Sequence, residues 1–496
     1  MSETALTSRD APRLEGRLAS FCARALGDRG EDAIASRVVY GGTVAYAALF
    51  ASAAILHWVV FKEARFDLGN MVQAIWNTLH GHFLETTTAT GHQRNRLGFH
   101  VDPFLLLFAP LLWVWSNPVL LPVVQALAVA SGALPVFWLA RKHLGSSRTA
   151  AHFAVAYLLY PATQFNAFTI AAGFHSVSFA VPLLLYGIWF LDEDRLVAFC
   201  VVALLACTTK EEIPLAVGCL GIWVAVRKGR RLFGLSVFAA GLALTMFNFL
   251  WLIPRFAPAR VDPYAGRYRG VGGTPQGMAH KLFSDPVAFV HAVATGHKAF
   301  YLALLLVPFL GLWLFEPLLL LGALPDLAIN LLSDKPVQTV VGYQYTAGIV
   351  PFVVAASIFG AKRFPSRSAG LSLGVVACAA AVAIYSPIYL GAKDLKALGS
   401  PVVAAKARAL NLIPKDVPVA ASNELGGHLS ERRYIYEFPY VRHARWIILD
   451  INDITQGDTP AYRQVVRNFE HDKAVWRIVF SSHGIIVLHK RPASGT

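Results

Sequence analysis

Residues 195–226 read RLVAFCVVALLACTTKEEIPLAVGCLGIWVAV, and Lys210, Glu211 and Glu212 interrupt an otherwise apolar stretch. Apolar runs of this kind are typical of helices that cross a lipid bilayer. Charged side chains among them cost several kcal/mol unless they are paired or hydrated, so they usually have a function. The stretch predicts two membrane helices joined by a functional hinge. The alternative is a short solvated hairpin at the membrane surface.

The composition of the whole chain also indicates a membrane protein. Of its 496 residues, 55% are hydrophobic and 15% are charged, whereas soluble domains carry about 25% charged residues. The formal net charge of +14 lies largely in short Lys/Arg clusters between apolar runs, as the positive-inside rule describes. This placement argues against nucleic acid as a partner and favours membrane lipids.

The apolar runs predict a polytopic α-helical membrane protein with about eleven spans. The expected spans are 38–60, 118–140, 149–166, 173–191, 195–209, 213–226, 232–254, 298–315, 317–333, 346–361 and 369–390. The run 101–116 is expected to dip into the membrane without crossing, because all four basic clusters then face the cytoplasm. These clusters are the N-terminal tail, Arg141-Lys142 with Arg148, Arg227-Lys228-Arg230-Arg231, and Lys362-Arg363 with Arg367.

This topology predicts three parts in the cytoplasmic (inner) membrane. Residues 1–37 form a cytoplasmic tail, residues 38–390 the transmembrane domain, and residues 391–496 an extracytoplasmic α/β domain. In the last part, strand-like apolar runs alternate with a helical pattern, and WRIVFSSHGIIVLHK is typical of a hairpin. The connections expected outside are the loops 61–100, 208–214, 255–297 and 334–345. They hold nearly all the unusual polar residues of the apolar region.

The first outer loop opens with FKEARFDLGNMVQAIWNTLHG, residues 61–81. After Asp67, apolar residues recur at helical spacing, which predicts an amphipathic helix in the membrane interface. Asp67 is expected at or near the N-cap of this helix, and capping alone is the structural alternative to a catalytic role. Gln73 and Asn77 lie off the apolar stripe and are candidates for substrate binding.

Further candidates lie beside the later outer loops. His100 and Asp102 precede the dipping helix, and His175 begins an apolar span; capping for Asp102 and packing for His175 are the structural alternatives. The loop 255–297 is long enough to cover a site, and its arginines suit phosphate, although a merely solvated loop fits equally. The remaining candidates are Arg260, Arg267 and Arg269 in this loop, Asp326 in LPDLAIN, and Tyr343, Gln344 and Tyr345 in GYQYTAGIVPF.

These residue types favour one kind of chemistry. The sequence contains no HExxH, no GxSxG and no metal-spaced Cys/His cluster. A carboxylate can deprotonate an acceptor hydroxyl while cations stabilise a departing lipid phosphate, which suits transfer from a lipid-linked substrate. In the C-terminal part a polar stretch could face a ligand, or serve only as helix caps and surface charge. Its residues are Asn423, Glu424, His428, Arg432 and Arg433.

The stretches FDLGNMVQAIWNTLHG, TTKEEIPL and SNELGGHLSERRYIYEFP resemble a bacterial and archaeal family of predicted membrane proteins of unknown function. That resemblance runs from about residue 40 nearly to the end. The order of elements is also similar to the GT-C superfamily of polyprenyl-phosphate-sugar glycosyltransferases. There, an acidic residue opens the first outer loop, and an LARxxxG-like turn (here 139–145) and a TK hinge (here Thr209-Lys210) follow.

The GT-C resemblance implies an inverting transferase that moves a sugar from a polyprenyl phosphate to an outer acceptor. By position, Asp67 matches the general base and Lys210 the lysine near the lipid phosphate. Many relatives have paired acids in the first loop, whereas Leu68 follows Asp67 here, so the need for a divalent metal stays open. A lipid transporter or flippase, and a non-catalytic envelope assembly factor, are the other hypotheses. The oligomeric state is not specified by the sequence.

Overall fold

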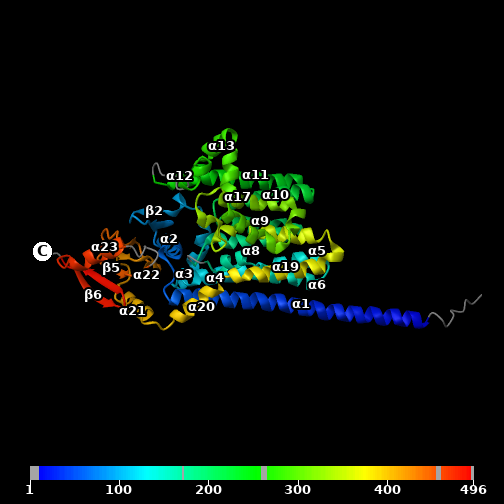
Figure 1. The fold of residues 1–496 in the computed structure, drawn as a ribbon, viewed down its shortest axis with the longest axis horizontal. Helices are drawn as coiled ribbons and strands as arrows, with labels where there is room; N and C mark the ends of the chain where they lie inside the picture. The colour runs from blue at the N-terminus through cyan, green and yellow to red at the C-terminus, as the bar shows by residue number, and fades with distance from the viewer. Residues whose placement is uncertain (1–10, 170–172, 259–264, 454–459, 493–496) are drawn as a thin grey trace, which may run out of the picture.

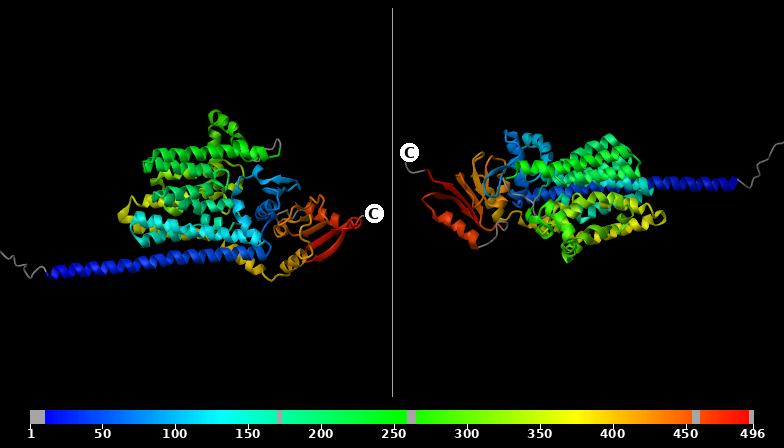
Figure 2. Two further views of the ribbon diagram at one scale, coloured as in Figure 1. Left: turned by 180° about the vertical axis from the view of Figure 1, so that it is seen from behind. Right: turned by 90° about the horizontal axis from the view of Figure 1, so that it is seen from above.

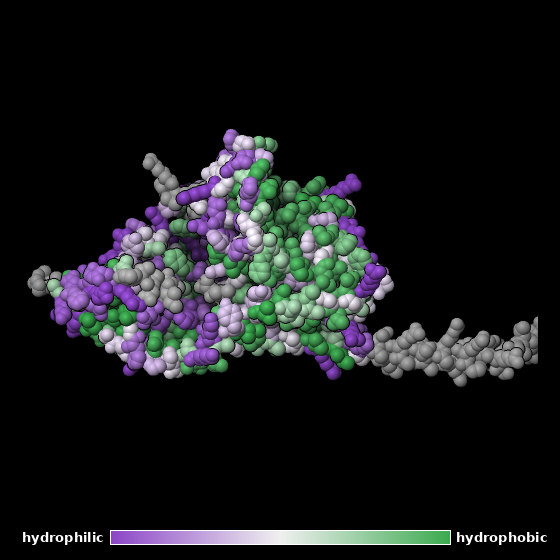
Figure 3. Space-filling model, viewed as in Figure 1, coloured by the Kyte–Doolittle hydropathy of each residue, from purple (hydrophilic) through white to green (hydrophobic). Residues whose placement is uncertain are grey.

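The structure is a computed structural model that describes residues 11–169, 173–258, 265–453 and 460–492. A bundle of helices makes up one part of the molecule, and the C-terminal α/β region covers one end of it (Figure 1). Helix α1 (Ala11–Val59) runs along one side of the bundle towards that region in all views (Figures 1 and 2). On the face drawn in Figure 3, apolar side chains cover the bundle between two more polar ends, as expected for a membrane-spanning domain.

Helix length and composition identify some of the membrane spans. Among the described residues, four helices are long and apolar enough to cross a membrane, or five if one bent pair is counted. They are Gly30–Val59, Leu120–Leu144, Arg231–Phe256 and Pro365–Ala397, and the bent pair is Val287–Val293 with Gly296–Phe309. Other expected spans coincide with shorter apolar helices, so the predicted count of eleven is not confirmed.

The helices that make up the bundle, including those within these long spans, mostly lie close to the predicted spans. They are α4 (Leu120–Ser131), α5 (Ala133–Leu144), α6 (Ser147–Leu159), α7 (Pro161–Ala167), α8 (Ala180–Asp192), α9 (Leu196–Cys207), α10 (Ile213–Arg227), α11 (Arg231–Phe247), α15 (Gly296–Leu306), α16 (Pro317–Leu320), α17 (Leu324–Leu332), α18 (Val350–Ala361), α19 (Ser368–Val382) and α20 (Ile388–Ala397). The run 101–116 forms a 3₁₀ turn (Pro103–Phe108) and the short helix α3 (Ala109–Val114).

Three basic clusters meet at the bundle end opposite the C-terminal region (Figure 1). Lys142 Nζ lies 2.7 Å from Asp192 Oδ2, and Lys228 Nζ donates to the Asp192 carbonyl at 2.8 Å. Lys362 Nζ lies 3.2 Å from His143 Nδ1. The sequence placed these clusters on one side of the membrane, and the structure brings them to one end of the bundle.

The C-terminal region contains a sheet with helices on both faces. Within the described residues its strand order is β4-β3-β5-β7-β6, with β3 parallel to β4 and β5, and β7 antiparallel to β5 and β6. Helix α21 (Pro401–Leu410) packs on one face and α23 (Pro460–His471) on the other. The strands are β3 (Val419–Ala421), β4 (Ile435–Glu437), β5 (Trp446–Asp450), β6 (Trp476–Ser482) and β7 (Ile485–Lys490). The predicted hairpin and the strands over VPVAAS and RWIILD are present, whereas β4 was not predicted.

A buried charge network ties α21 to the sheet. Lys406 is 3% exposed, and its Nζ lies 2.7 Å from Glu424 Oε2 and 2.9 Å from Asp450 Oδ2. Burial raises the pKa of Glu424, but Lys406 and Lys62 lower it by more, so the net pKa lies below its ordinary value. The contribution of Glu424 to stability is therefore complete above its unfolded pKa of about 4.3 and is lost as the pH falls through the folded value.

Lys406→Met is expected to lower the stability of this region by about 3–5 kcal/mol at pH 7, because two buried carboxylates lose their cation. The difference in stability between Lys406→Met and wild type should become smaller below about pH 4, where the carboxylates become protonated. Thermal unfolding of the full-length protein in detergent between pH 7 and pH 3 measures both effects. Lys396→Met, at an exposed lysine of α20, is the control. Equal stability of Lys406→Met and wild type at pH 7 would contradict the network's role.

Candidate functional site

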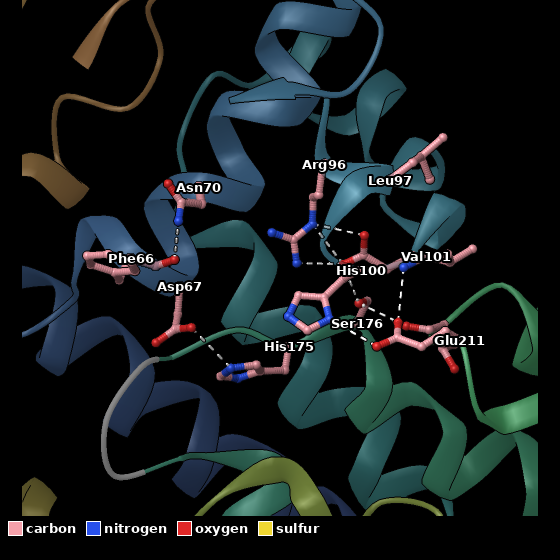
Figure 4. Close-up of polar contacts among 12 residues, drawn as sticks. Phe66, Asp67, Asn70, Arg96, Leu97, His100, Val101, His175, Ser176 and Glu211 are labelled. Carbon is pink, nitrogen blue, oxygen red and sulfur yellow. Dashed lines mark hydrogen bonds and ion pairs between the residues drawn. The ribbon is translucent and has the colours of Figure 1, made fainter. Parts of the chain in front are cut away.

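Four segments that are far apart in the sequence meet where the bundle faces the C-terminal region. Asp67 of the first outer loop lies beside His175, and His100 lies beside Glu211 of the hinge (Figure 4). Lys210 of the hinge lies over the ring of Tyr345, with 5.9 Å between Nζ and the ring centroid. Most of the candidates chosen from the sequence therefore converge on one site.

Asp67 sits in a π-helical turn, Arg65–Gly69, that leads directly into α2 (Asn70–Leu79). The expectation that Asp67 caps this helix is wrong: Gly69 occupies the N-cap position of α2, and no side chain caps either element. Asp67 is 40% exposed at its side chain, and Oδ1 lies 3.5 Å from His175 Nε2. Since the carboxylate does not cap the helix, it can act as a base.

His175 is fixed from the other side by the bundle. Its main-chain N–H donates to Gln125 Oε1 at 2.7 Å, and its side chain is only 8% exposed. Nδ1 of His175 has no hydrogen-bond partner among the described residues. The histidine is thus buried behind Asp67 with one nitrogen facing the carboxylate, so it does more than pack, which was the structural alternative for this candidate.

Glu63 is a second acid close to this pair. It is fully buried, its Oε2 accepts a hydrogen bond of 2.9 Å from the Gly173 N–H, and burial raises its pKa. A Cβ at Gly173 would collide with the Glu63 carboxylate, so only glycine allows this contact. Within the described residues no three His, Cys, Asp or Glu side chains are grouped to hold a metal ion. The need for a divalent metal stays open, as in the sequence analysis.

The hinge between α9 and α10 carries three consecutive ionisable side chains, Lys210, Glu211 and Glu212. Lys210 Nζ lies 2.6 Å from Glu212 Oε1, and Glu211 accepts hydrogen bonds from His100 Nδ1 (3.1 Å) and the Val101 N–H (3.0 Å). Glu211 and Glu212 are 2% and 4% exposed. The alternative of a solvated hairpin is therefore wrong. Burial raises the pKa of Glu212 even though Lys210 opposes the shift.

The later outer segments complete the surroundings of Lys210. Asp326 of α17 accepts a hydrogen bond of 3.0 Å from the Gly348 N–H through Oδ2, while its Oδ1 has no partner in the described part of the chain. The rings of Tyr343 and Tyr345 lie 6.1 Å apart, and Gln344 lies between them in the sequence. Asp326 lies within electrostatic range of Lys210, and Tyr345 lies in cation–π range of it.

The Arg-rich loop is anchored next to the same site. The Arg267 carbonyl accepts from the Asp334 N–H at 2.7 Å, and the Gly270 N–H donates to Asp334 Oδ2 at 3.0 Å. The Tyr268 hydroxyl is hydrogen-bonded to Gln338 and lies within electrostatic range of Lys210. Arg269 is exposed, and Arg260 lies outside the described residues. Tyr268 and Gln338 were missed from the sequence because neither interrupts an apolar pattern.

Three other candidates, Gln73, Asn77 and Asp102, make structural contacts. Gln73 bonds to Thr87 and to the carbonyls of Arg432 and Arg433, and Asn77 Nδ2 donates to the Glu85 carbonyl. They tie α2 to the hairpin β1 (Glu85–Thr87) and β2 (Gln93–Asn95) and to the C-terminal region. Asp102 occupies an N-cap position without capping, and it forms a bidentate pair with Arg96 at 2.7–2.9 Å.

Asp102→Asn is expected to lower stability by about 3–5 kcal/mol, because it leaves the Arg96 guanidinium, 10% exposed, without its counterion. The yield of monodisperse protein after detergent extraction and the thermal unfolding midpoint should both fall. Asp285→Asn, at an exposed aspartate in the loop 255–297, should change neither. An unfolding midpoint of Asp102→Asn equal to that of wild type would show that the Arg96–Asp102 pair does not stabilise the protein.

The fold and the site define a polytopic membrane protein with a cluster of buried charges at one end of its helical bundle. The chain belongs to the family of predicted membrane proteins DUF2079, whose profile matches residues 57–487. This confirms the family expected from the sequence. No curated protein matches the chain.

Solved structures with similarity to this chain include ArnT and an oligosaccharyltransferase. ArnT from Cupriavidus metallidurans bound to undecaprenyl phosphate is 12% identical, with a TM-score of 0.47, and its apo form is 13% identical, with a TM-score of 0.48. Each match covers 90% of this chain and 98% of ArnT. The oligosaccharyltransferase from Archaeoglobus fulgidus, in complex with zinc and sulfate, is 14% identical over 89% of this chain and 73% of its own, with a TM-score of 0.43. At these values no substrate or reaction carries over.

Proposed function

We propose that this protein is a membrane glycosyltransferase that passes a sugar from a polyprenyl-phosphate donor to an acceptor outside the cytoplasmic membrane. The observation that carries the proposal is the pairing of a half-exposed Asp67 with a buried His175, together with the partly buried cation Lys210 of the neighbouring hinge. The donor class itself comes from the sequence resemblance.

In the proposed reaction Asp67 is the general base. Its carboxylate takes the proton of the acceptor hydroxyl as the acceptor oxygen attacks the anomeric carbon of the sugar. The bond between this carbon and the phosphate oxygen breaks, and its electron pair leaves with the polyprenyl phosphate. A single displacement of this kind inverts the anomeric configuration. The contact with His175 holds the Asp67 carboxylate in place.

Lys210 and the Arg-rich loop would bind the departing phosphate. A buried ammonium stabilises developing negative charge more strongly than a solvated one, because the surrounding dielectric constant is low. In the free protein Glu212 balances Lys210 at 2.6 Å. The raised pKa of Glu212 fits a role in which it gives up that contact to the phosphate and takes a proton. Arg267 and Arg269 are the further donors, and Tyr343, Gln344 and Tyr345 would line the sugar.

A detergent assay separates this function from its rivals. An extract of a deletion strain holds both the unused donor and the unmodified acceptor. Purified protein added to it should raise the acceptor mass by one sugar residue and release polyprenyl phosphate, as read by mass spectrometry. A flippase or an assembly factor would leave both unchanged, since detergent abolishes the two compartments. No mass change with folded wild-type protein would contradict the transferase proposal.

A further inference from the structure

Three parallel strands of the C-terminal sheet end at the same edge. Asn423 and Glu424 follow β3, Glu437 ends β4, and Asp450 ends β5. The chain passes from β3 outward to β4 and then back to β5 on the other side of β3. In open α/β sheets, ligands bind outside the carboxyl ends of the strands at such a reversal. A ligand of the C-terminal α/β region would therefore be expected at this edge of the sheet.

The edge is occupied by the protein's own first loop. Lys62 Nζ lies 2.9 Å from Glu424 Oε1, and Arg65 Nη2 lies 3.0 Å from Glu437 Oε2. The Phe66 N–H donates to Asn423 Oδ1 at 3.2 Å. All three contacts come from the five residues that precede Asp67.

The contact between the loop and the edge is close, and Arg65 is buried in it. The Arg65 side chain is 0% exposed, and its Nη1 also donates to the Thr87 carbonyl at 3.0 Å. A Cβ at Gly427 would lie 2.9 Å from the Glu63 carbonyl, and one at Gly69 would collide with Ser430 Oγ. Small residues on both sides thus allow the two main chains to approach each other.

We propose that the C-terminal α/β region clamps the turn that carries Asp67, and that Asn423 and Glu437 are positioning residues for the reaction; this rests on the proposed function. Arg65 and Phe66 immediately precede Asp67 in a π-helical turn, a conformation that is rare and frequent at functional sites. The geometry of this turn is held by side chains of the C-terminal region that lie more than 350 positions away in the sequence. Asn423 and Glu437 touch neither the acceptor nor the donor, and they act through the position of the Asp67 carboxylate.

Loss of the clamp should affect turnover more than binding. A misplacement of about 1 Å can cost about 10²-fold in rate. Asn423→Ala should therefore lower kcat for the transfer by about 10- to 100-fold, with KM for the donor within about twofold. Asn423→Asp keeps an oxygen that accepts from the Phe66 N–H and should restore most of the rate. Glu431→Gln is the matched control, because Glu431 also contacts the bundle, through Ser116, but not the Asp67 turn.

Hydrogen exchange of the full-length protein tests the clamp without any substrate. The Phe66 amide should exchange about fivefold faster in Asn423→Ala, because it loses a hydrogen bond worth about 1 kcal/mol. It should exchange at the wild-type rate in Glu431→Gln. If Asn423→Ala does not accumulate, Glu437→Gln gives the same comparison through Arg65.

The outcomes separate the clamp from the proposed function. Unchanged exchange at Phe66, or an equal loss of kcat in Asn423→Ala and Glu431→Gln, would overturn the clamp. Faster exchange in Asn423→Ala together with a wild-type protein that transfers no sugar would support the clamp and contradict the proposed function. Faster exchange with a loss of kcat that Asn423→Asp restores is the result we expect.

Discussion

Asp67→Asn is expected to lower the rate of sugar transfer by about 10²- to 10⁴-fold, the usual contribution of a general base. The substitution keeps the size of the side chain and removes only its ability to take a proton. The folded protein should accumulate normally, because Asp67 is 40% exposed and caps no helix. Initial rates with purified protein and an extract of a deletion strain measure the effect.

A matched control uses the same substitution at the opposite end of the bundle. Asp194 is 49% exposed and pairs with Arg230 and Lys228, so Asp194→Asn should keep the wild-type rate. His175→Gln should lower the rate less than Asp67→Asn, since it disturbs the orientation of the base but leaves the base present. A rate for Asp67→Asn within threefold of wild type would remove Asp67 from the reaction.

Lys210→Met is expected to lower both the stability of the protein and the rate of transfer. Glu211, Glu212 and Asp326 are all within electrostatic range of Lys210, and removal of the cation leaves them buried with one another. Breaking a buried pair in this way costs about 3–5 kcal/mol. The thermal unfolding midpoint and the yield of folded protein should both fall.

A double substitution separates the two effects of Lys210. Lys210→Met with Glu212→Gln removes the charged pair as a unit, which is usually much less costly than removing one partner. Its midpoint should therefore recover towards wild type, while transfer stays at least about 10²-fold reduced, as after loss of one electrostatic donor. Recovery of transfer along with stability would show that Lys210 is structural only.

Local sequence patterns predicted much of the fold. The apolar runs located nearly all the bundle helices, and the period-two runs located β3, β5 and the β6–β7 hairpin. The strand β4 was missed because its three residues lie in a polar stretch and gain their place from pairing with β3. Helix α9 has 12 residues, about 18 Å at 1.5 Å per residue, so hydropathy alone overstates what such a segment can span.

The candidate site was predicted residue by residue but not as an assembly. Charges inside an apolar run pointed to Lys210, Glu211 and Glu212, since burial makes them costly without a partner. The contact of Asp67 with His175 spans more than 100 positions, and no local periodicity reports it. The same holds for the contact between Arg65 and Glu437, 372 positions apart, which no local pattern indicates.

The measurement that tests the central claim most directly is mass spectrometry of envelope glycolipids and glycoproteins. It compares cells that carry the wild-type, deleted, Asp67→Asn and Asp194→Asn alleles, with the amount of each protein in the membrane checked alongside. We expect the deletion and Asp67→Asn to remove the same sugar from one acceptor, while Asp194→Asn retains it. A complete set of glycans in the deletion strain, or full restoration of a lost sugar by Asp67→Asn, would contradict the account.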